Sequence, residues 1–237
     1  MEEMIRLNKY IAESGICSRR EADRLIEAQK VMVNGDIATT GMQVSDRDEV
    51  LVNGKRISRK NEKIVLAYYK PVGVTCTEKD KYAETTVKDV LDYPVRVTYA
   101  GRLDKESEGL LLMTNDGNLI NALMKGINGH EKEYLVRVNK ELPKDFKEKM
   151  ENGIYLDELK VTTKECKVRI VGPYTFEIVL TQGLNRQIRR MCEVQGLKVL
   201  GLKRTRIANI ELGKLKYGTY RRITGDELNK LYSCVEL

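Results

Sequence analysis

The sequence predicts an α+β protein in two parts. These are a small αα-β domain over residues 1–62 and a mostly antiparallel mixed sheet with helices over residues 63–237. The chain has 237 residues, of which 41% are hydrophobic, enough for one large core or two modest ones. In the first part, two helical segments precede alternating apolar and polar residues. In the second, strand patterns outnumber helical ones and do not alternate with them regularly, which argues against a doubly wound sheet.

The first part starts with two helical patterns. Leu7, Ile11 and Ile16 follow helical spacing roughly, and the SRRE stretch at 18–21 is a capping box that predicts a second helix over 19–29. An alternating run then contains two Asn-Gly pairs, at 34–35 and 53–54, which predict tight turns of a small sheet.

The second part follows the charged stretch ISRKNEK, which we interpret as a linker because it has no apolar periodicity. Strand patterns are found at residues 63–69, 109–114, 132–138, 165–171, 174–181 and 198–211. Helical patterns lie near residues 117–125, 143–151, 185–195 and 224–232.

Composition excludes several kinds of chemistry. The five cysteines are scattered without a C-x-x-C pair, and the single histidine argues against triad hydrolases and most zinc enzymes. Neither a dinucleotide fingerprint nor a P-loop is present. We therefore expect no metal and no cofactor. The charged start and the lack of any stretch of about 20 apolar residues predict a cytoplasmic protein without a membrane span.

Positive charge is concentrated near the C-terminus. The formal net charge is +7, yet residues 1–62 hold eleven Lys/Arg and eleven Asp/Glu, whereas residues 183–222 hold eleven and two, a local excess of 11 − 2 = +9. Such a segment is either a solvated face or a groove that contacts the phosphates of a polyanion. If it is such a groove, Lys203, Arg204 and Arg206 are its predicted phosphate contacts.

Residues 6–35, RLNKYIAESGICSRREADRLIEAQKVMVNG, resemble the small RNA-binding domain named after ribosomal small-subunit protein four. In that family the paired helices present basic side chains to structured RNA. By position, the resemblance implies RNA contacts by Arg6, Lys9, Arg19, Arg20 and Arg24. The alternative is a neutral helical cap with exposed charges.

Three later stretches occur in a characteristic order: GRLDKESEGLLLMTNDG from residue 101, HEKEYLVRV from 130 and GLNRQIRRMCEVQG from 183. Together they resemble the motifs of the RsuA branch of pseudouridine synthases, which isomerise uridine in ribosomal RNA. GLNRQIRRMCE and RTRIANI are most similar to the RluF and RluB type, which acts on 23S ribosomal RNA. The partner implied is ribosomal RNA or a ribosome assembly intermediate, and we expect a monomer.

The resemblance assigns roles to residues. Asp104 would be the catalytic carboxylate, either attacking the anomeric carbon or removing a sugar proton. Arg189 would favour the ionised form of Asp104 and orient it. Tyr134 would stack on the uracil and move the proton of ring carbon five. Arg102 would fill the gap left by the flipped nucleotide from the same face of a strand end as Asp104. Arg186 and Arg190 are further predicted substrate contacts.

Each residue also has a structural interpretation. Asp104 alone could be a turn residue, Tyr134 a strand aromatic and Arg189 a helix-surface charge. Two other functions fit part of the pattern: a non-catalytic RNA-binding assembly factor, and an RNA glycosylase that stops after bond cleavage. The first gives no reason for the four motif residues to occur together, and the second would release free uracil.

Overall fold

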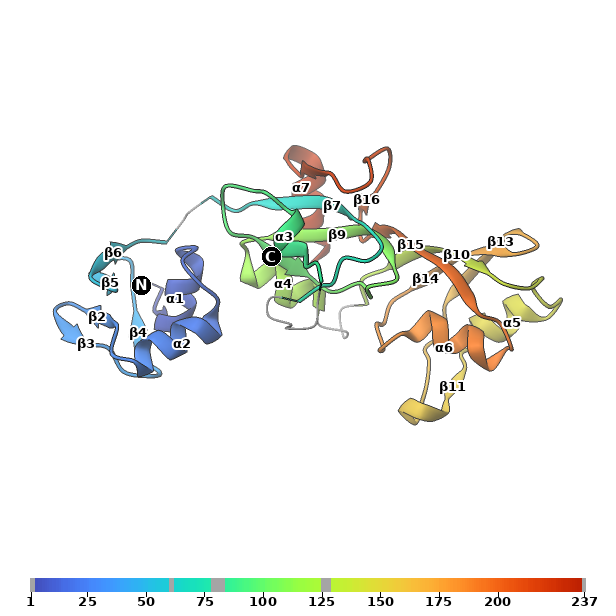
Figure 1. Ribbon diagram of the computed structural model, residues 1–237, viewed down its shortest axis with the longest axis horizontal. Coiled ribbons are helices and arrows are strands. Elements are labelled where there is room, and N and C mark those ends of the chain that lie inside the picture. The colour runs from blue at the N-terminus through green and yellow to red at the C-terminus, as the bar shows by residue number, and fades with distance from the viewer. Residues whose placement is uncertain (1–2, 60–61, 78–83, 125–128, 236–237) are drawn as a thin grey trace. The chain divides into compact units, whose positions relative to one another are not determined.

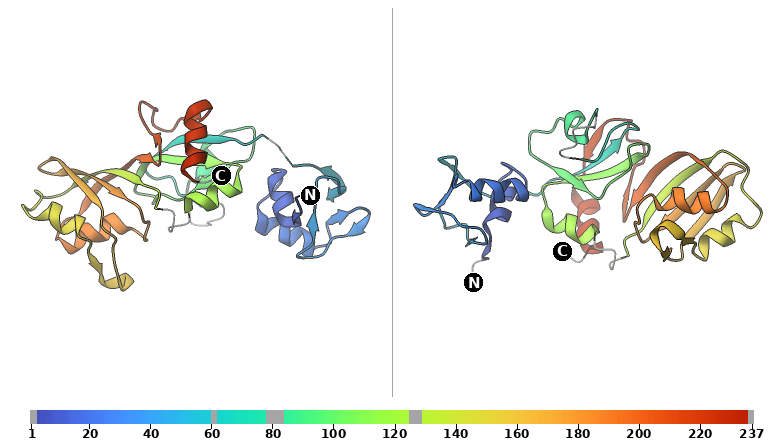
Figure 2. Two further views of the ribbon diagram at one scale, coloured as in Figure 1. Left: turned by 180° about the vertical axis from the view of Figure 1, so that it is seen from behind. Right: turned by 60° about the horizontal axis from the view of Figure 1, so that its bottom comes forward.

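The computed structural model describes residues 3–59, 62–77, 84–124 and 129–235. The chain divides into two compact units (Figures 1 and 2). The first comprises the chain up to Ile64 with Tyr93–Thr98 and Asn115–Gly117, and the second comprises Val65–Asp92, Tyr99–Thr114 and Asn118–Leu237. Within the described residues, no helix is long and apolar enough to cross a membrane.

The first unit combines two helices with short strands. In chain order they are β1 (Ile5–Arg6), α1 (Leu7–Glu13), α2 (Arg19–Glu27), β2 (Val31–Val33), β3 (Asp36–Ile37), β4 (Gln43–Val44), β5 (Val50–Val52) and β6 (Lys55–Ile57). The order β3-β2-β5-β6 forms one antiparallel sheet, and β1 pairs with β4. The small αα-β architecture predicted for this part is confirmed.

Local signals set the boundaries of these elements. Ser18 Oγ accepts a hydrogen bond from Glu21 N at 3.3 Å, as expected for the cap of α2. Asn34 and Asn53 have positive φ angles of 51° and 50°, which Asn-Gly turns require. Helix α1 ends earlier than the apolar spacing suggested, because Gly15 turns the chain with a φ of 87° and leaves Ile16 50% exposed.

The start of the ISRKNEK stretch is held by the first unit. Ile57 ends β6 and is buried. Arg59 forms ion pairs with Asp46 and Glu13, and its guanidinium carbon lies 5.9 Å from the ring centroid of Tyr10. Arg59 therefore packs on the first unit, and this end of the predicted linker belongs to that unit.

The second unit is built on one large sheet with the strand order β13-β14-β10-β15-β9-β7-β17. The strands are β7 (Val65–Lys70), β9 (Glu108–Thr114), β10 (Lys132–Val138), β13 (Lys167–Gly172), β14 (Thr175–Leu180), β15 (Val199–Ile207) and β17 (Tyr220–Arg222), with β8 (Thr98–Ala100) beside β9 and β16 (Ile210–Glu211) beside β15. Along this order every pair is antiparallel except β15 and β9. This confirms the α+β class with a mostly antiparallel mixed sheet.

Helices cover the sheet in two groups, with one apolar core under each. Helices α5 (Phe146–Glu151) and α6 (Gln187–Val194) pack against β10, β13 and β14, whereas α4 (Gly117–Met124) and α7 (Gly225–Cys234) pack against β7 and β9 (Figure 1). The remaining elements are α3 (Val87–Val90), a 3-10 turn η2 (Asp157–Leu159) and the pair β11 (Tyr155–Leu156) and β12 (Val161–Thr162). The parallel pair of β15 and β9 joins the two halves.

The strand predicted over 198–211 is two strands. Strand β15 ends at Ile207, Ala208 has a positive φ of 49°, and β16 turns back to pair Ile210 with Ile207. No glycine or proline marks this turn, and the apolar pattern continues across it, so the sequence predicted one strand instead of two.

Candidate active site

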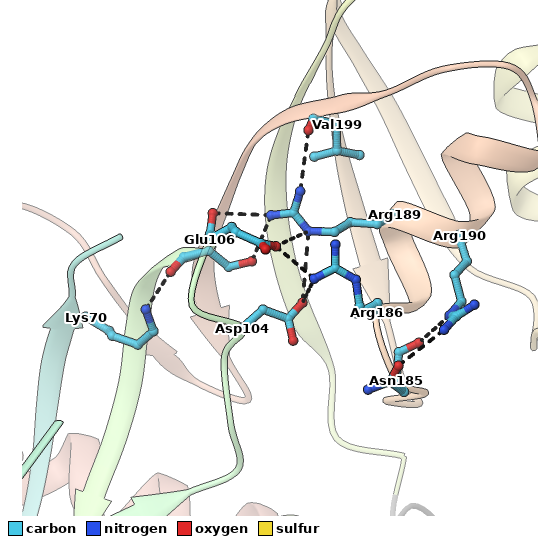
Figure 3. A network of polar contacts seen from close by, with 9 residues as sticks. Lys70, Asp104, Glu106, Asn185, Arg186, Arg189, Arg190 and Val199 are labelled. Atoms are coloured by element: carbon cyan, nitrogen blue, oxygen red, sulfur yellow. Dashed lines mark hydrogen bonds and ion pairs between the residues drawn. The ribbon is translucent and has the colours of Figure 1, made fainter. Parts of the chain in front are cut away.

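Asp104 lies in the loop between β8 and β9, close to two arginines (Figure 3). Its side chain is 35% exposed, and Arg186 Nη1 and Arg189 Nε both lie 4.0 Å from its Oδ2. The sequence had placed Arg102 and Asp104 at a strand end; instead they belong to the loop, where Leu103 between them is buried. The carboxylate is therefore reachable from solvent and has cations on one side.

Arg189 connects three parts of the second unit. From α6 its Nη2 donates to Glu106 O and Ser107 Oγ, both at 3.2 Å, and its Nη1 donates to Val199 O at 3.4 Å (Figure 3). Its buried Nε has no hydrogen-bond partner within the described residues. The residue is 8% exposed, so the alternative of a helix-surface charge is excluded.

Glu106 is a second carboxylate of this cluster, and the sequence did not single it out. Arg186 Nη1 donates to its Oε2 at 2.8 Å, and Arg189 Nε lies 3.9 Å from the same oxygen. The hydrogen bond with Arg186 lowers the pKa of Glu106 and raises the pKa of Arg186. Arg186 is the N-cap residue of α6 and has the left-handed conformation, with a φ of 52°. In the sequence, the only signal for a second carboxylate at this site was the presence of Glu106 and Glu108 shortly after Asp104.

Two further buried cations hold the Asp104 loop through its main chain. Lys70 Nζ donates to Ser107 O at 2.7 Å and to Pro71 O at 2.6 Å. Arg204 Nε donates to Leu110 O at 2.7 Å, and its Nη1 donates to Arg102 O at 3.4 Å. Together with Arg189, they fix the loop on both sides of Asp104.

One row of residues crosses the middle of the sheet at this point. Lys70 in β7 is paired with Gly109 in β9, Gly109 with Arg204 in β15, and Arg204 with Tyr134 in β10. Gly109 has a φ of +107°, and a Cβ there would lie 2.3 Å from Arg204 O. Only glycine allows this approach, which brings the end of the Asp104 loop against β15.

Tyr134 is half-buried in this row. It packs against the apolar core beneath α5 and α6, and Ile178 in β14 is its partner on the other side. Strand β10 has the bounds predicted from the sequence. In the row, Arg204 of β15 lies between Tyr134 and Gly109, so Tyr134 is two strands away from the start of β9, which follows the Asp104 loop.

Several predicted contacts lie elsewhere. Arg190 points away from Asp104, and its Nε donates to Asn185 O at 3.1 Å (Figure 3). It also forms an ion pair with Glu158. Arg204 is only 2% exposed, so the prediction of a phosphate contact is wrong for it: its guanidinium binds main-chain carbonyls. Arg206 is paired with Glu131 at 2.9 Å and Glu133 at 3.0 Å. Lys203 Nζ lies 5.0 Å from the ring centroid of Tyr69.

The basic residues of the first unit are better placed for a ligand. Arg6, Arg19, Arg20 and Arg24 are exposed, and Lys9 is half-buried. Two have carboxylate partners: Arg24 lies 3.1 Å from Glu21, and Lys9 lies 3.7 Å from Glu13. The exposed pair of Arg24 and Glu21 is worth little and can rearrange around a phosphate, whereas the pair of Lys9 and Glu13 is largely covered.

Comparison with known proteins identifies the family. The profile of RNA pseudouridylate synthases matches residues 64–194, more than half of the chain, and that of the S4 domain matches residues 5–50. This chain belongs to the RNA pseudouridylate synthase family.

The similarity to known relatives extends over almost the whole length of this chain. Dual-specificity RNA pseudouridine synthase RluF of Escherichia coli (strain K12) is 48% identical over 99% of this chain and 81% of its own. Ribosomal large subunit pseudouridine synthase B of Bacillus subtilis is 37% identical over 96% of both chains. A crystal structure of a pseudouridylate synthase has 31% identity and a TM-score of 0.71, covering 96% of this chain and 99% of the other. The resemblance to the RsuA branch with an S4 domain is confirmed.

In this pseudouridine synthase the described residues contain no group of three or more His, Cys, Asp or Glu side chains arranged to hold a metal ion. The five cysteines are free thiols.

The buried side chain of Lys70 should make the stability of the synthase depend on pH. Burial lowers its pKa from 10.5 to about 8, so the folded protein releases this proton near pH 8 while the unfolded chain keeps it until about 10.5. Between these values the unfolded state binds more protons, and the Lys70 contribution to the free energy of unfolding should rise by up to about 1.4 kcal/mol per pH unit. Denaturant unfolding of wild type and Lys70→Met from pH 7 to 10.5 measures it.

The difference in unfolding free energy between wild type and Lys70→Met should therefore shift in favour of wild type as the pH rises above 8. Lys147→Met, at an exposed position in α5, is the matched control and should show no such shift. A pH-independent difference for Lys70→Met would mean that Lys70 titrates normally.

Proposed function

We propose that this synthase converts a uridine of 23S ribosomal RNA, free or in an assembly intermediate, to pseudouridine. Two observations support this proposal, the first its target and the second its reaction. The Bacillus subtilis relative is named for the large ribosomal subunit, and the loop around Asp104 has the carboxylate and cation arrangement that the isomerisation needs. We infer that the protein acts as a monomer in the cytoplasm.

Asp104 is the catalytic carboxylate of this proposal. The reaction breaks the bond between the anomeric carbon and ring nitrogen one, turns the uracil and forms a bond from the anomeric carbon to ring carbon five. An ionised carboxylate begins it, either as nucleophile or as base toward a sugar proton. Arg189 Nε and Arg186 Nη1, both 4.0 Å from Oδ2, place two positive charges on one side of this carboxylate.

Arg189 is the residue that supports this proposal most strongly. Its buried guanidinium binds the main chain of the loop and leaves Nε 4.0 Å from Asp104, so a fixed positive charge stands beside the carboxylate while the substrate enters. The solvent exposure of Asp104 leaves space for a flipped nucleotide.

Tyr134 and Arg102 complete the site. The Tyr134 ring would stack on the uracil, and its hydroxyl is suited to take the proton that leaves ring carbon five, while ring nitrogen one gains a proton. Arg102 is exposed two residues before Asp104 and would fill the gap in the RNA. Arg186 would contact the substrate from the start of α6.

The two domains would divide the work. Residues 1–62, the S4 domain, would bind structured RNA through Arg6, Lys9, Arg19, Arg20 and Arg24, and residues 63–237 would hold the active site. Lys203 and Arg206 would add phosphate contacts beside it.

Incubation of the purified protein with an in vitro transcript of 23S ribosomal RNA tests the proposal. We expect chemical mapping to find pseudouridine at a specific position, with the mass of the RNA unchanged because the reaction is an isomerisation. Release of free uracil would instead identify a glycosylase. Binding of the transcript without any new pseudouridine would identify an RNA-binding factor or a different RNA substrate.

A further inference from the structure

Tyr217 presents an exposed aromatic ring that is fixed at two points. The residue is 55% exposed and lies between β16 and β17, outside the residues that the synthase profile matches. Its ring meets Tyr69 edge-on, with centroids 5.2 Å apart and planes at 62°, and its hydroxyl accepts a hydrogen bond from Val72 N at 3.0 Å. Fixing an exposed side chain costs conformational entropy, so this arrangement needs a reason.

The support beneath the ring is rigid. Tyr69 is 8% exposed in β7, and its hydroxyl donates to Glu108 at 2.9 Å. Burial and this carboxylate raise the pKa of Tyr69, which therefore stays a neutral donor. Lys203 in β15, which is paired in register with Glu108, has its Nζ 5.0 Å from the centroid of the same ring.

The fixed ring is tied to the catalytic loop. Val72 lies two residues after Lys70, which donates to Ser107 O, and the next residue, Gly73, donates from its N to Lys105 O at 2.8 Å. The segment that anchors the Tyr217 hydroxyl is thus hydrogen-bonded to the residue next to Asp104. A ligand group on the Tyr217 ring and a ligand group at Asp104 would therefore be held by parts of the protein that are hydrogen-bonded to each other.

The charge around the ring suits a nucleic acid. Lys214 and Lys216 are exposed in the same segment as Tyr217, and Lys203 lies at its base. Unpaired nucleotides bind to proteins through aromatic rings that stack on the base and basic side chains that follow the phosphates. A flipped uridine also leaves neighbouring nucleotides that need a place on the enzyme.

We propose that Tyr217, with Lys203, Lys214 and Lys216, forms a stacking subsite for an unpaired nucleobase of the substrate RNA other than the target uridine. The subsite rests on the proposed function, because the ligand is taken from the same RNA. Tyr217 supplies the ring face, and the lysines bind the phosphates on either side.

The test measures the affinity of the full chain for the 23S ribosomal RNA stem-loop that it binds most tightly, using Tyr217→Leu and Tyr217→Phe. Tyr155→Leu in β11 is the control, because Tyr155 is 54% exposed and has no part in the subsite. We expect Tyr217→Leu to weaken binding by roughly tenfold or more. Tyr217→Phe should stay near wild type because it keeps the ring, as should Tyr155→Leu. Affinity of Tyr217→Leu equal to that of Tyr155→Leu would overturn the subsite.

Abasic replacement of each unpaired nucleotide, one at a time, identifies the stacked base without relying on a variant that folds. One position should weaken wild type about as much as Tyr217→Leu does, and the two changes together should add little. If no position weakens wild type, or if every loss adds in full to that of Tyr217→Leu, the subsite is wrong. Since affinity is measured separately from conversion, a wild-type protein that binds RNA but forms no pseudouridine would overturn the proposed function instead.

Discussion

Replacing Asp104 with asparagine is expected to abolish pseudouridine formation while leaving RNA affinity nearly unchanged. Asparagine keeps the size of the side chain and removes the ionised oxygen on which both proposed routes depend. We expect single-turnover rates at saturating RNA to fall by about 10⁴-fold to 10⁶-fold, the range seen when one residue of a catalytic unit is removed. Folding should be little affected, because the carboxylate is 35% exposed and accepts no short hydrogen bond from its arginines.

The control for this variant is Asp157→Asn, at an exposed aspartate of η2 in the same unit. It should retain wild-type turnover. If Asp104→Asn kept even about a tenth of wild-type turnover on its own RNA, Asp104 would not be the catalytic carboxylate.

Replacing Arg189 with methionine should give the second largest effect. Methionine fills most of the buried volume, but it removes the cation 4.0 Å from Asp104 and the donors to Glu106 O, Ser107 Oγ and Val199 O. We expect turnover to fall by about 10²–10³, the range for losing one preorganised electrostatic contact. The buried acceptors left without a donor should lower the free energy of unfolding by about 1–3 kcal/mol.

The neighbour Arg190 gives a control on the same helix. Arg190→Met removes an arginine that contacts Glu158 and Asn185 rather than Asp104, so turnover should change by less than about threefold. Single-turnover rates, measured at a temperature where thermal melts show both variants folded, separate the two effects. Equal losses of turnover in both variants would indicate that α6 acts only as a scaffold.

Local sequence signals determined much of this fold. Ser18 caps α2, the Asn-Gly pairs have positive φ, and β10 has the bounds that its pattern predicted, because caps, turns and alternation depend on residues close in sequence. The motif around Asp104 and the family were also readable from the sequence, since the motifs keep their residue types and their order.

The tertiary structure decided which cations serve the site. Arg186, Arg189 and Arg190 look alike in NRQIRR, yet Arg189 is buried against the Asp104 loop and Arg190 turns toward Glu158. Arg204 looks like a phosphate contact, but in the sheet it lies beside Gly109 and binds carbonyl oxygens. Charge and periodicity show which face a residue occupies, whereas its partner depends on the register between strands that are distant in sequence. That register is set by nonlocal packing, here by the close approach of β9 and β15 that only Gly109 permits.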